Sequence, residues 1–169
     1  AKYFESFAKT DTIVFDKTGT LTEAQPRLAC VLTTDGWSDD EVLRLSACLE
    51  EHFPHPVARA VVNAARERGL EHRERHAAVE YIVAHGIASS IEGRRAIIGS
   101  AHFVFEDESA QLESDIKEQI ESQMQGLSPL YLAVDGTVVG VLGIEDPLKP
   151  GVREAIADLH ALGVKHVVM

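Results

Sequence analysis

Hydrophobic residues recur along this chain with two different periods, and these periods predict its strands and helices. Runs rich in β-branched and aromatic residues predict a buried strand at 12–15 and a second strand at 27–34. Ser38 and Glu41 form a capping-box pattern before an apolar stripe at helical spacing, which predicts a helix start. Segment 56–69 has Pro in its first turn and Gly at its end, which predicts a second helix.

The centre of the chain predicts a sheet with one further helix. Segment 79–106 is rich in β-forming residues interrupted by glycines, so we expect antiparallel strands with a tight hairpin at 92–94. Segment 109–125 predicts a polar, acidic helix. The run LYLAVDGTVVGVLGI (130–144) predicts two strands, because its Asp-Gly pair favours a two-residue hairpin turn.

The last segment changes character. It predicts a helix over 150–162, with Pro150 in its first position, a Gly163 cap and a final strand over 164–169. A helix-coupled strand at each end of the chain indicates two pieces of one parallel α/β layer, with an α+β domain inserted between them. The expected boundaries are 1–22 plus 141–169 for the layer and 23–140 for the insertion.

Composition narrows the function classes. The 169 residues are 45% hydrophobic and carry a formal net charge of −11, which argues against a nucleic-acid or anionic-membrane partner. Cys30 and Cys48 lie far apart without a CxxC spacing and indicate two buried thiols in a reducing compartment. The longest apolar run, 138–144, is too short to span a bilayer, and no signal peptide is visible.

The strongest chemical signal is the stretch IVFDKTGTLT. Asp16 ends a strand, where ligands bind in open α/β sheets, and a carboxylate can accept a phosphoryl group as an acyl phosphate. Lys17 and Gly19 suit a crowded anionic site, and the hydroxyl groups of Thr18 and Thr20 can position phosphate oxygens.

The run DKTGTLT resembles the phosphorylation signature of P-type ATPases, whose phosphorylation domain is haloacid-dehalogenase-like. The resemblance implies a partial Rossmann-like parallel layer with an inserted nucleotide-binding domain. It implies ATP and Mg²⁺ as cofactors, Asp16, Lys17 and Thr18 as catalytic residues, and Asp16 and Thr18 as metal ligands. Soluble phosphatases of that superfamily usually carry a second aspartate at the position of Thr18. Thr18 therefore favours a phosphoenzyme that persists until another domain hydrolyses it.

The stretch LEEHFPHPVARAVV resembles the His-Pro motif of heavy-metal (type IB) pumps. There the histidine and a glutamate five positions earlier contact the adenine, which assigns His55 and Glu50 to nucleotide binding. An imidazole can hydrogen-bond a purine, and a carboxylate can accept from its exocyclic amine. Taken alone, His-Pro would indicate only a helix cap. The sequence departs from the family at Phe53 and Pro54, where Ser-Glu is common.

The stretch AHGIASSIEGRRAIIGS resembles the glycine motif of the same branch, in which bare backbone lets the nucleotide lie against the strands. Gly86, Ile87 and Gly99 match and are expected to bind nucleotide. Ala84 stands at the usual first-glycine site and Ser100 where asparagine is frequent. Without a ligand, these would be ordinary hairpin glycines.

The stretch DPLKP resembles the element that re-enters the phosphorylation domain. Lys149 is expected to offer charge to the nucleotide phosphates, and Asp146 could accept backbone hydrogen bonds at the hinge. The remaining histidines show no spacing that demands a metal. His72 and His76 are one helical turn apart, but a solvated helix face explains them better.

The resemblance covers the whole chain and implies the cytoplasmic catalytic segment of a heavy-metal cation pump in the cell membrane. Its partners would be membrane helices and an actuator domain, with the transported cation bound elsewhere. Later family motifs that hold Mg²⁺ are not in this sequence, so we expect residues 1–169 alone to autophosphorylate poorly. The alternatives are a soluble phosphatase with a cap domain and a non-catalytic nucleotide-binding module. The metal, the direction of transport and the oligomeric state are not encoded in these residues.

Overall fold

The structure is a computed structural model that describes residues 9–70, 80–82, 86–91 and 93–169. It divides into two compact units, one of residues up to Gln25 and from Asp146 onward, the other Pro26–Glu145. The expected boundary at 140/141 falls inside a strand, and the structure assigns that whole strand to the second unit.

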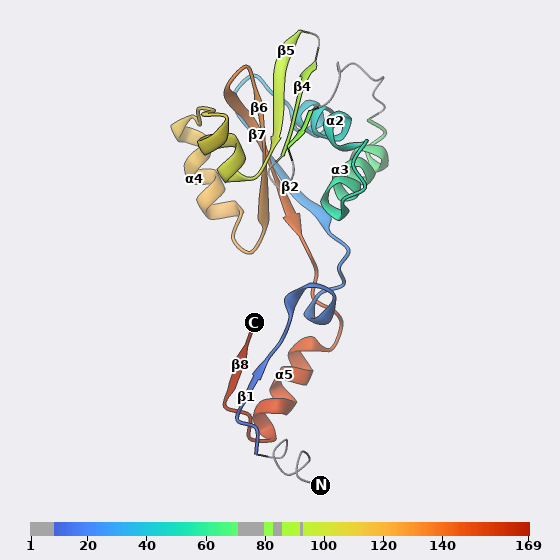
Figure 1. Cartoon of the computed structure of the whole chain (residues 1–169), viewed down its shortest axis with the longest axis vertical. Helices are drawn as coiled ribbons and strands as arrows, with labels where there is room; N and C mark the ends of the chain where they lie inside the picture. The colour runs from blue at the N-terminus through green and yellow to red at the C-terminus, as the bar shows by residue number, and fades with distance from the viewer. Residues whose placement is uncertain (1–8, 71–79, 83–85, 92) are drawn as a thin grey trace. The chain divides into compact units, whose positions relative to one another are not determined.

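The larger unit is built on a six-stranded antiparallel sheet with the strand order β2-β7-β6-β5-β4-β3 (Figure 1). Its strands are β2 (Arg27–Thr33), β3 (Glu80–Ile82), β4 (Gly86–Ile91), β5 (Arg94–Gly99), β6 (Ser128–Val134) and β7 (Thr137–Glu145). Asp135 and Gly136 both have positive φ, 49° and 79°, which is the backbone of the two-residue turn that the Asp-Gly pair predicted.

The prediction of strand structure through residue 106 was wrong at its end. Residues His102–Asp107 form a short helical segment, η2, because Ser100 starts a turn in which its hydroxyl oxygen accepts from the Phe103 amide at 3.3 Å. Phe103 and Val104, which suggested a strand by composition, are fully buried through this turn instead. The polar helix α4 covers Ser114–Gln123 and is shorter than predicted.

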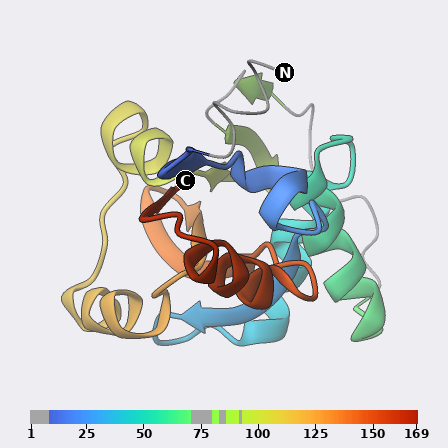
Figure 2. The same cartoon turned by 90° about the horizontal axis from the view of Figure 1, so that it is seen from below.

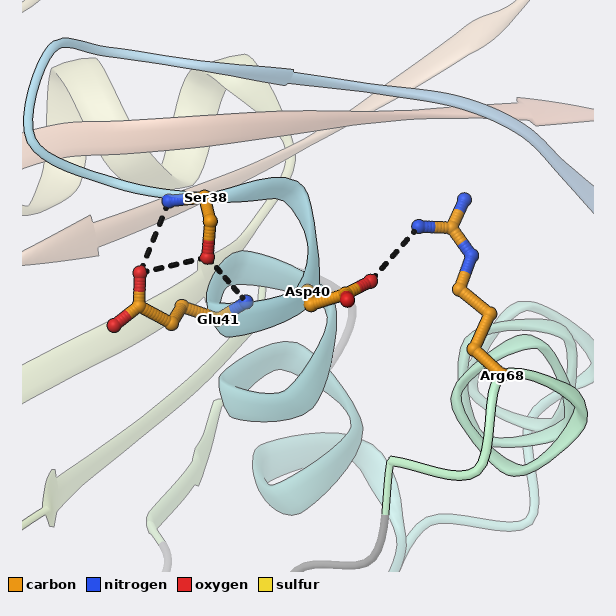
Figure 3. Close-up of polar contacts among 4 residues, drawn as sticks. All are labelled: Ser38, Asp40, Glu41 and Arg68. Carbon is orange, nitrogen blue, oxygen red and sulfur yellow. Dashed lines mark hydrogen bonds and ion pairs between the residues drawn. The ribbon is translucent and has the colours of Figure 1, made fainter.

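Helices α2 (Asp39–Glu50) and α3 (Pro56–Glu67) start where the sequence predicted. Ser38 caps α2 through the expected capping box: its hydroxyl oxygen accepts from the Glu41 amide, and the Glu41 carboxylate accepts from the Ser38 amide at 3.0 Å (Figure 3). The guanidinium of Arg68 donates to Asp40 at 3.3 Å and ties the end of α3 to the start of α2.

The sheet separates two hydrophobic clusters. Helices α2 and α3 cover one face, and η2 and α4 cover the other (Figure 1). Ile87 and Ile98 belong to the α2–α3 side, whereas Ala88, Ile97 and Phe103 belong to the α4 side. This alternation along β4 and β5 follows from the two-residue period of a strand.

The smaller unit pairs β1 (Thr12–Val14) in parallel with β8 (His166–Val168), and helix α5 (Val152–Ala161) lies beside the pair (Figures 1 and 2). The parallel pairing confirms the expected layer. The expectation of a buried first strand was wrong, since Val14 is 72% exposed. Pro150 precedes the helix, which begins after Gly151 instead. None of the described helices is long and apolar enough to cross a membrane.

Candidate functional site

Asp16 stands at the end of β1, on an exposed and sharply turning loop. Its own backbone is extended (φ −70°, ψ 142°), and the helical turn η1 (Lys17–Leu21) follows at once. That turn is broken by non-helical dihedrals at Thr18 and Gly19. Gly19 has φ 79°, a left-handed conformation that side chains with a Cβ rarely adopt. A glycine in the DKTG run is therefore what allows the chain to reverse directly after the carboxylate.

The returning segment 146–149 holds this loop in place. The Thr22 hydroxyl group, in a residue only 1% exposed, donates to Asp146 Oδ2 at 2.6 Å. Two backbone bonds flank this contact: the Glu23 amide donates to the Pro147 carbonyl, and the Lys149 amide to the Leu21 carbonyl, each at 2.9 Å. The loop that carries Asp16 is thus part of a small, fixed hydrogen-bonded structure.

Lys149 also bonds the loop through its side chain, because its ammonium group donates to the carbonyl oxygen of Gly19. The ammonium group therefore contacts the DKTG loop at Gly19, which is three positions after Asp16 in the sequence. Its expected contact with nucleotide phosphates stays a prediction. Among the described residues, Asp146 accepts from a side chain, the Thr22 hydroxyl group, and not from the backbone groups that the sequence suggested.

The oxygen donors near Asp16 fit Mg²⁺ only together with a substrate. The described residues contain no cluster of three or more His, Cys, Asp or Glu side chains that could hold a metal ion by themselves. Mg²⁺ in proteins is commonly held by one or two carboxylates together with phosphate oxygens and waters. One exposed carboxylate, Asp16, with the oxygens of Thr18 beside it suits that mode.

The larger unit contains a pocket of about 220 Å³. Five of the residues that the sequence predicted for nucleotide binding line it together: Glu50, His55, Gly86, Ile87 and Gly99. They come from the end of α2, the start of α3 and the facing strands β4 and β5. The remaining lining residues among those described are Phe53, Val57, Ile98, Ser100 and Leu130.

Glu50 is the acidic group of this pocket. The residue is only 8% exposed, and burial raises the pKa of its carboxyl group from the usual 4.5 to about 7. A carboxyl group that titrates near neutral pH can serve either as an acceptor or as a donor.

His55 has a structural task in addition to its place in the pocket. It is the N-cap of α3, and its Nδ1 atom accepts from the Val57 amide at 3.3 Å. Because Nδ1 is the acceptor, the neutral ring carries its proton on Nε2. His55 is therefore both a helix cap and a lining residue of the pocket.

Gly86 is needed for packing inside the protein. A Cβ atom at this position would lie 2.3 Å from Phe103 Cδ1 and 2.5 Å from the Ile98 carbonyl oxygen. We expected a glycine here because bare backbone lets a nucleotide approach the strands. Packing gives a second reason, because Phe103 fills the space that a side chain would need. Gly86 lies opposite Gly99 in the β4–β5 register, so its backbone still lines the pocket.

Among the apolar lining residues, only Ile87 was predicted for this site. Phe53 and the polar residue Ser100 were noted only as departures from a family pattern. Phe53, Ile98 and Leu130 look like ordinary core residues in the sequence, and only the tertiary structure brings them to the pocket. Ala84, His72 and His76, which the sequence analysis discussed, lie outside the described residues.

Comparisons with known proteins identify the family of this chain. Residues 10–169 match the family model described as haloacid dehalogenase-like hydrolase. A copper-exporting P-type ATPase of Legionella pneumophila is 36% identical over 100% of this chain, and a probable copper-exporting P-type ATPase of Mycobacterium tuberculosis is 34% identical over 95%. Other relatives are named for zinc, manganese and silver. This chain spans only 23% and 21% of the first two relatives.

Among solved structures, a zinc-transporting PIB-type ATPase in its E2.Pi state superposes with a TM-score of 0.71 at 28% identity. That match covers 97% of this chain and 26% of the other. The chain therefore belongs to the haloacid dehalogenase-like hydrolase family, and its homologues are heavy-metal P-type ATPases.

Proposed function

We propose that this chain is the catalytic segment of an ATP-driven heavy-metal pump. In this proposal the pocket of the larger unit binds the base of ATP, and the γ-phosphoryl group passes to Asp16. The observation that carries the proposal is the convergence of Glu50, His55 and Gly99 on one pocket, although they are spread over 50 positions of the sequence.

The pocket suits the base end of a nucleotide. Its lining is mainly apolar, with Glu50, His55 and Ser100 as the polar side chains among the described residues. No Lys or Arg side chain belongs to that described lining, so the pocket offers a flat heterocycle an apolar slot but gives the phosphates no charge partner. The triphosphate would then extend out of the pocket.

The chemistry at Asp16 is a phosphoryl transfer. The carboxylate oxygen attacks the γ-phosphorus, the bond to the bridging β-phosphate oxygen breaks, and ADP leaves with that electron pair. Mg²⁺, when bound to the phosphates beside Asp16 and Thr18, would supply charge neutralisation for this transfer. The Lys149–Gly19 and Thr22–Asp146 bonds keep the loop fixed, so that the carboxylate meets the phosphate in a set position.

Labelling of the intact protein with ATP carrying a radioactive γ-phosphate tests the proposal. We expect an acid-stable, hydroxylamine-sensitive label that Asp16→Asn abolishes. Release of phosphate from a small phosphomonoester without any trapped phosphoenzyme would instead favour a soluble phosphatase. The transported ion is a heavy-metal cation in this proposal. The relatives are named for copper, zinc, manganese and silver, so identifying the ion requires transport measurements with each metal.

A further inference from the structure

Two sulfur-containing side chains meet on the α4 side of the sheet, in the hydrophobic cluster that does not line the pocket. A Cβ atom built on Gly143 of β7 would lie 2.7 Å from Cys30 Sγ and 2.9 Å from Met124 Sδ. The two sulfur atoms are therefore at most 5.6 Å apart, which is the sum of those distances. The chain has only two cysteines and two methionines, so a sulfur-rich core does not explain this meeting.

The backbone brings the two side chains together from distant parts of the larger unit. Cys30 lies on the edge strand β2, directly opposite Gly143 of β7, and an irregularity in the β2–β7 register precedes it. Met124 ends α4, and its amide donates to the Ile120 carbonyl at 3.0 Å. Met124 is buried and Cys30 is half-buried. The pair therefore lies at the margin of the cluster, and the glycine leaves the space that both sulfur atoms use.

Thiolate and thioether sulfur are soft ligands that favour Cu⁺ and the chemically similar Ag⁺. A metal–thiolate bond is about 2.3 Å long for Zn²⁺, so two such bonds in line would span about 4.6 Å, within the limit set by the structure. Monovalent copper and silver accept such two-coordinate, linear binding. Among the described residues, Cys30 belongs to no group of three or more His, Cys, Asp or Glu side chains, which a tetrahedral Zn²⁺ site would need.

The balance of charge at this pair also favours a monovalent cation. On binding, the Cys30 thiol would lose its proton to the solvent, so that one thiolate, one neutral thioether and one monovalent cation sum to zero charge. A divalent cation would leave one positive charge beside apolar neighbours such as Leu127, whose Cδ1 atom also lies 2.7 Å from the built Cβ of Gly143. An uncompensated charge in such surroundings is costly.

We propose that Cys30 and Met124 form a binding site for one soft monovalent cation, Cu⁺ or Ag⁺, on the face of the sheet opposite the pocket. A bound cation would tie the edge strand β2 to the end of α4. The site requires neither ATP nor a phosphoryl group on Asp16, so it goes beyond the proposed function and stands or falls independently of it.

Ag⁺ is the probe, because it does not change its oxidation state on binding, and buffers without chloride keep it in solution. Residues 1–169 carrying Cys48→Ala, so that Cys30 is the only thiol, are titrated with isotope-labelled methionine methyl groups. We expect one equivalent of Ag⁺ to shift the methyl signal of Met124 and to leave that of Met169 unchanged. Cys30→Ser should abolish this shift. The titration is repeated with Cys48 intact, because the Met124 signal reports on this site even if Cys48→Ala does not fold.

Met124→Leu removes the thioether sulfur and keeps an apolar side chain of similar size. N-acetylcysteine, added as a competing thiol, should withdraw Ag⁺ from this variant at a concentration at least about tenfold lower than from the unmodified chain, because losing even a supporting group commonly costs a metal site that much affinity. The amide signals of Cys30 and Gly143 follow the release. Met169→Leu is the matched control and should need the same concentration as the unmodified chain.

Three results would overturn the inference. One is a chain that binds no Ag⁺. Another is a Met124 methyl signal that stays in place while Cys30 binds Ag⁺, and the third is an equal competitor concentration for Met124→Leu and Met169→Leu. The last two would show binding by the thiol only. None of the three bears on ATP binding or on labelling of Asp16, so the proposed function would stand.

Discussion

The hydroxyl group of Thr22 donates to the carboxylate of Asp146 at 2.6 Å, across 124 positions of the sequence. The bond joins the last threonine of the DKTGTLT run to the first residue of DPLKP. Both residues lie within four positions of the points where the chain passes from one unit to the other. One short contact therefore fixes the loop that carries Asp16 to segment 146–149, which follows the larger unit in the chain.

Removal of this hydroxyl group should destabilise the smaller unit. Thr22→Val leaves Asp146 Oδ2 without its donor, next to Oδ1, which is already buried without a partner among the described residues. We expect a loss of about 1–3 kcal/mol in the free energy of unfolding, measured by urea denaturation followed on NMR signals of that unit. Thr22→Ser, which keeps the hydroxyl group, is the control and should lose less than half as much. Equal losses in both variants would mean that the methyl group, and not the bond, matters.

The bond from Lys149 to Gly19 should protect the loop from opening. Lys149→Met keeps most of the aliphatic stem and removes the donor to the Gly19 carbonyl. Amide hydrogen exchange should therefore become faster from Gly19 to Thr22, whereas exchange in β6 and β7 stays unchanged. Lys165→Met, a change at another exposed lysine of the same unit, is the control. Unchanged exchange in Lys149→Met would show that the backbone bonds hold the loop without the ammonium group.

Gly86 should tolerate alanine poorly even in the absence of any ligand. The new Cβ would overlap both the ring of Phe103 and the backbone carbonyl of Ile98, and backbone cannot move aside cheaply. We expect Gly86→Ala to cost at least about 2 kcal/mol of stability, within the range for overpacked cores. Gly36→Ala is the comparison, because Gly36 has φ 86° but nothing within 4 Å of the added atom, so it should cost about 1 kcal/mol. A Gly86→Ala protein as stable as Gly36→Ala would contradict the packing found here.

The buried carboxyl group of Glu50 should make stability depend on pH. Its pKa is raised from 4.5 to about 7 in the folded state, so the folded state favours the neutral acid. The associated stability is complete below about pH 4.5 and is lost as the pH rises to about 7, up to roughly 3 kcal/mol in all. Glu50→Gln should remove this loss, and its advantage over the unmodified chain should grow between pH 5 and pH 8. If the free energies of unfolding of the two proteins varied with pH in the same way, Glu50 would not be the source of the pH dependence.

The two roles of His55 can be separated by substitution. Asparagine is a good N-cap and keeps the bond to the Val57 amide possible, whereas alanine does not. His55→Ala should therefore lose about 1 kcal/mol of stability and also weaken ATP binding. His55→Asn should keep most of the stability and still weaken ATP binding, as measured by calorimetry. If His55→Asn bound ATP as well as the unmodified chain, the histidine would be a helix cap and no more.

Features that depend on neighbouring residues could be predicted from the sequence. The capping box of Ser38 and Glu41, the Pro56 helix start and the Asp135–Gly136 turn all appear as expected, because each is decided within four residues. The helical segment after Ser100 was missed, since Phe103 and Val104 have the composition of a strand and only the core beneath them favours a turn.

Features that depend on distant residues could not be predicted. Phe103 dictates a glycine at position 86, and Asp146 was assigned no side-chain partner although Thr22 provides one. The pocket was predicted through Glu50, His55, Ile87 and two glycines, which belong to motifs with a recognisable spacing. Its apolar walls, such as Ile98 and Leu130, carry no such signal.

Binding of ATP to the pocket can be tested directly by an NMR titration of residues 1–169 with ATP, followed on backbone amides and on the His55 ring. We expect saturable shifts at Gly86, Ile87, Gly99 and Ser100, together with the His55 ring signals, and much smaller shifts on the α4 face of the sheet. An ATP titration that leaves these signals unchanged, or that perturbs mainly residues away from the pocket, would contradict it.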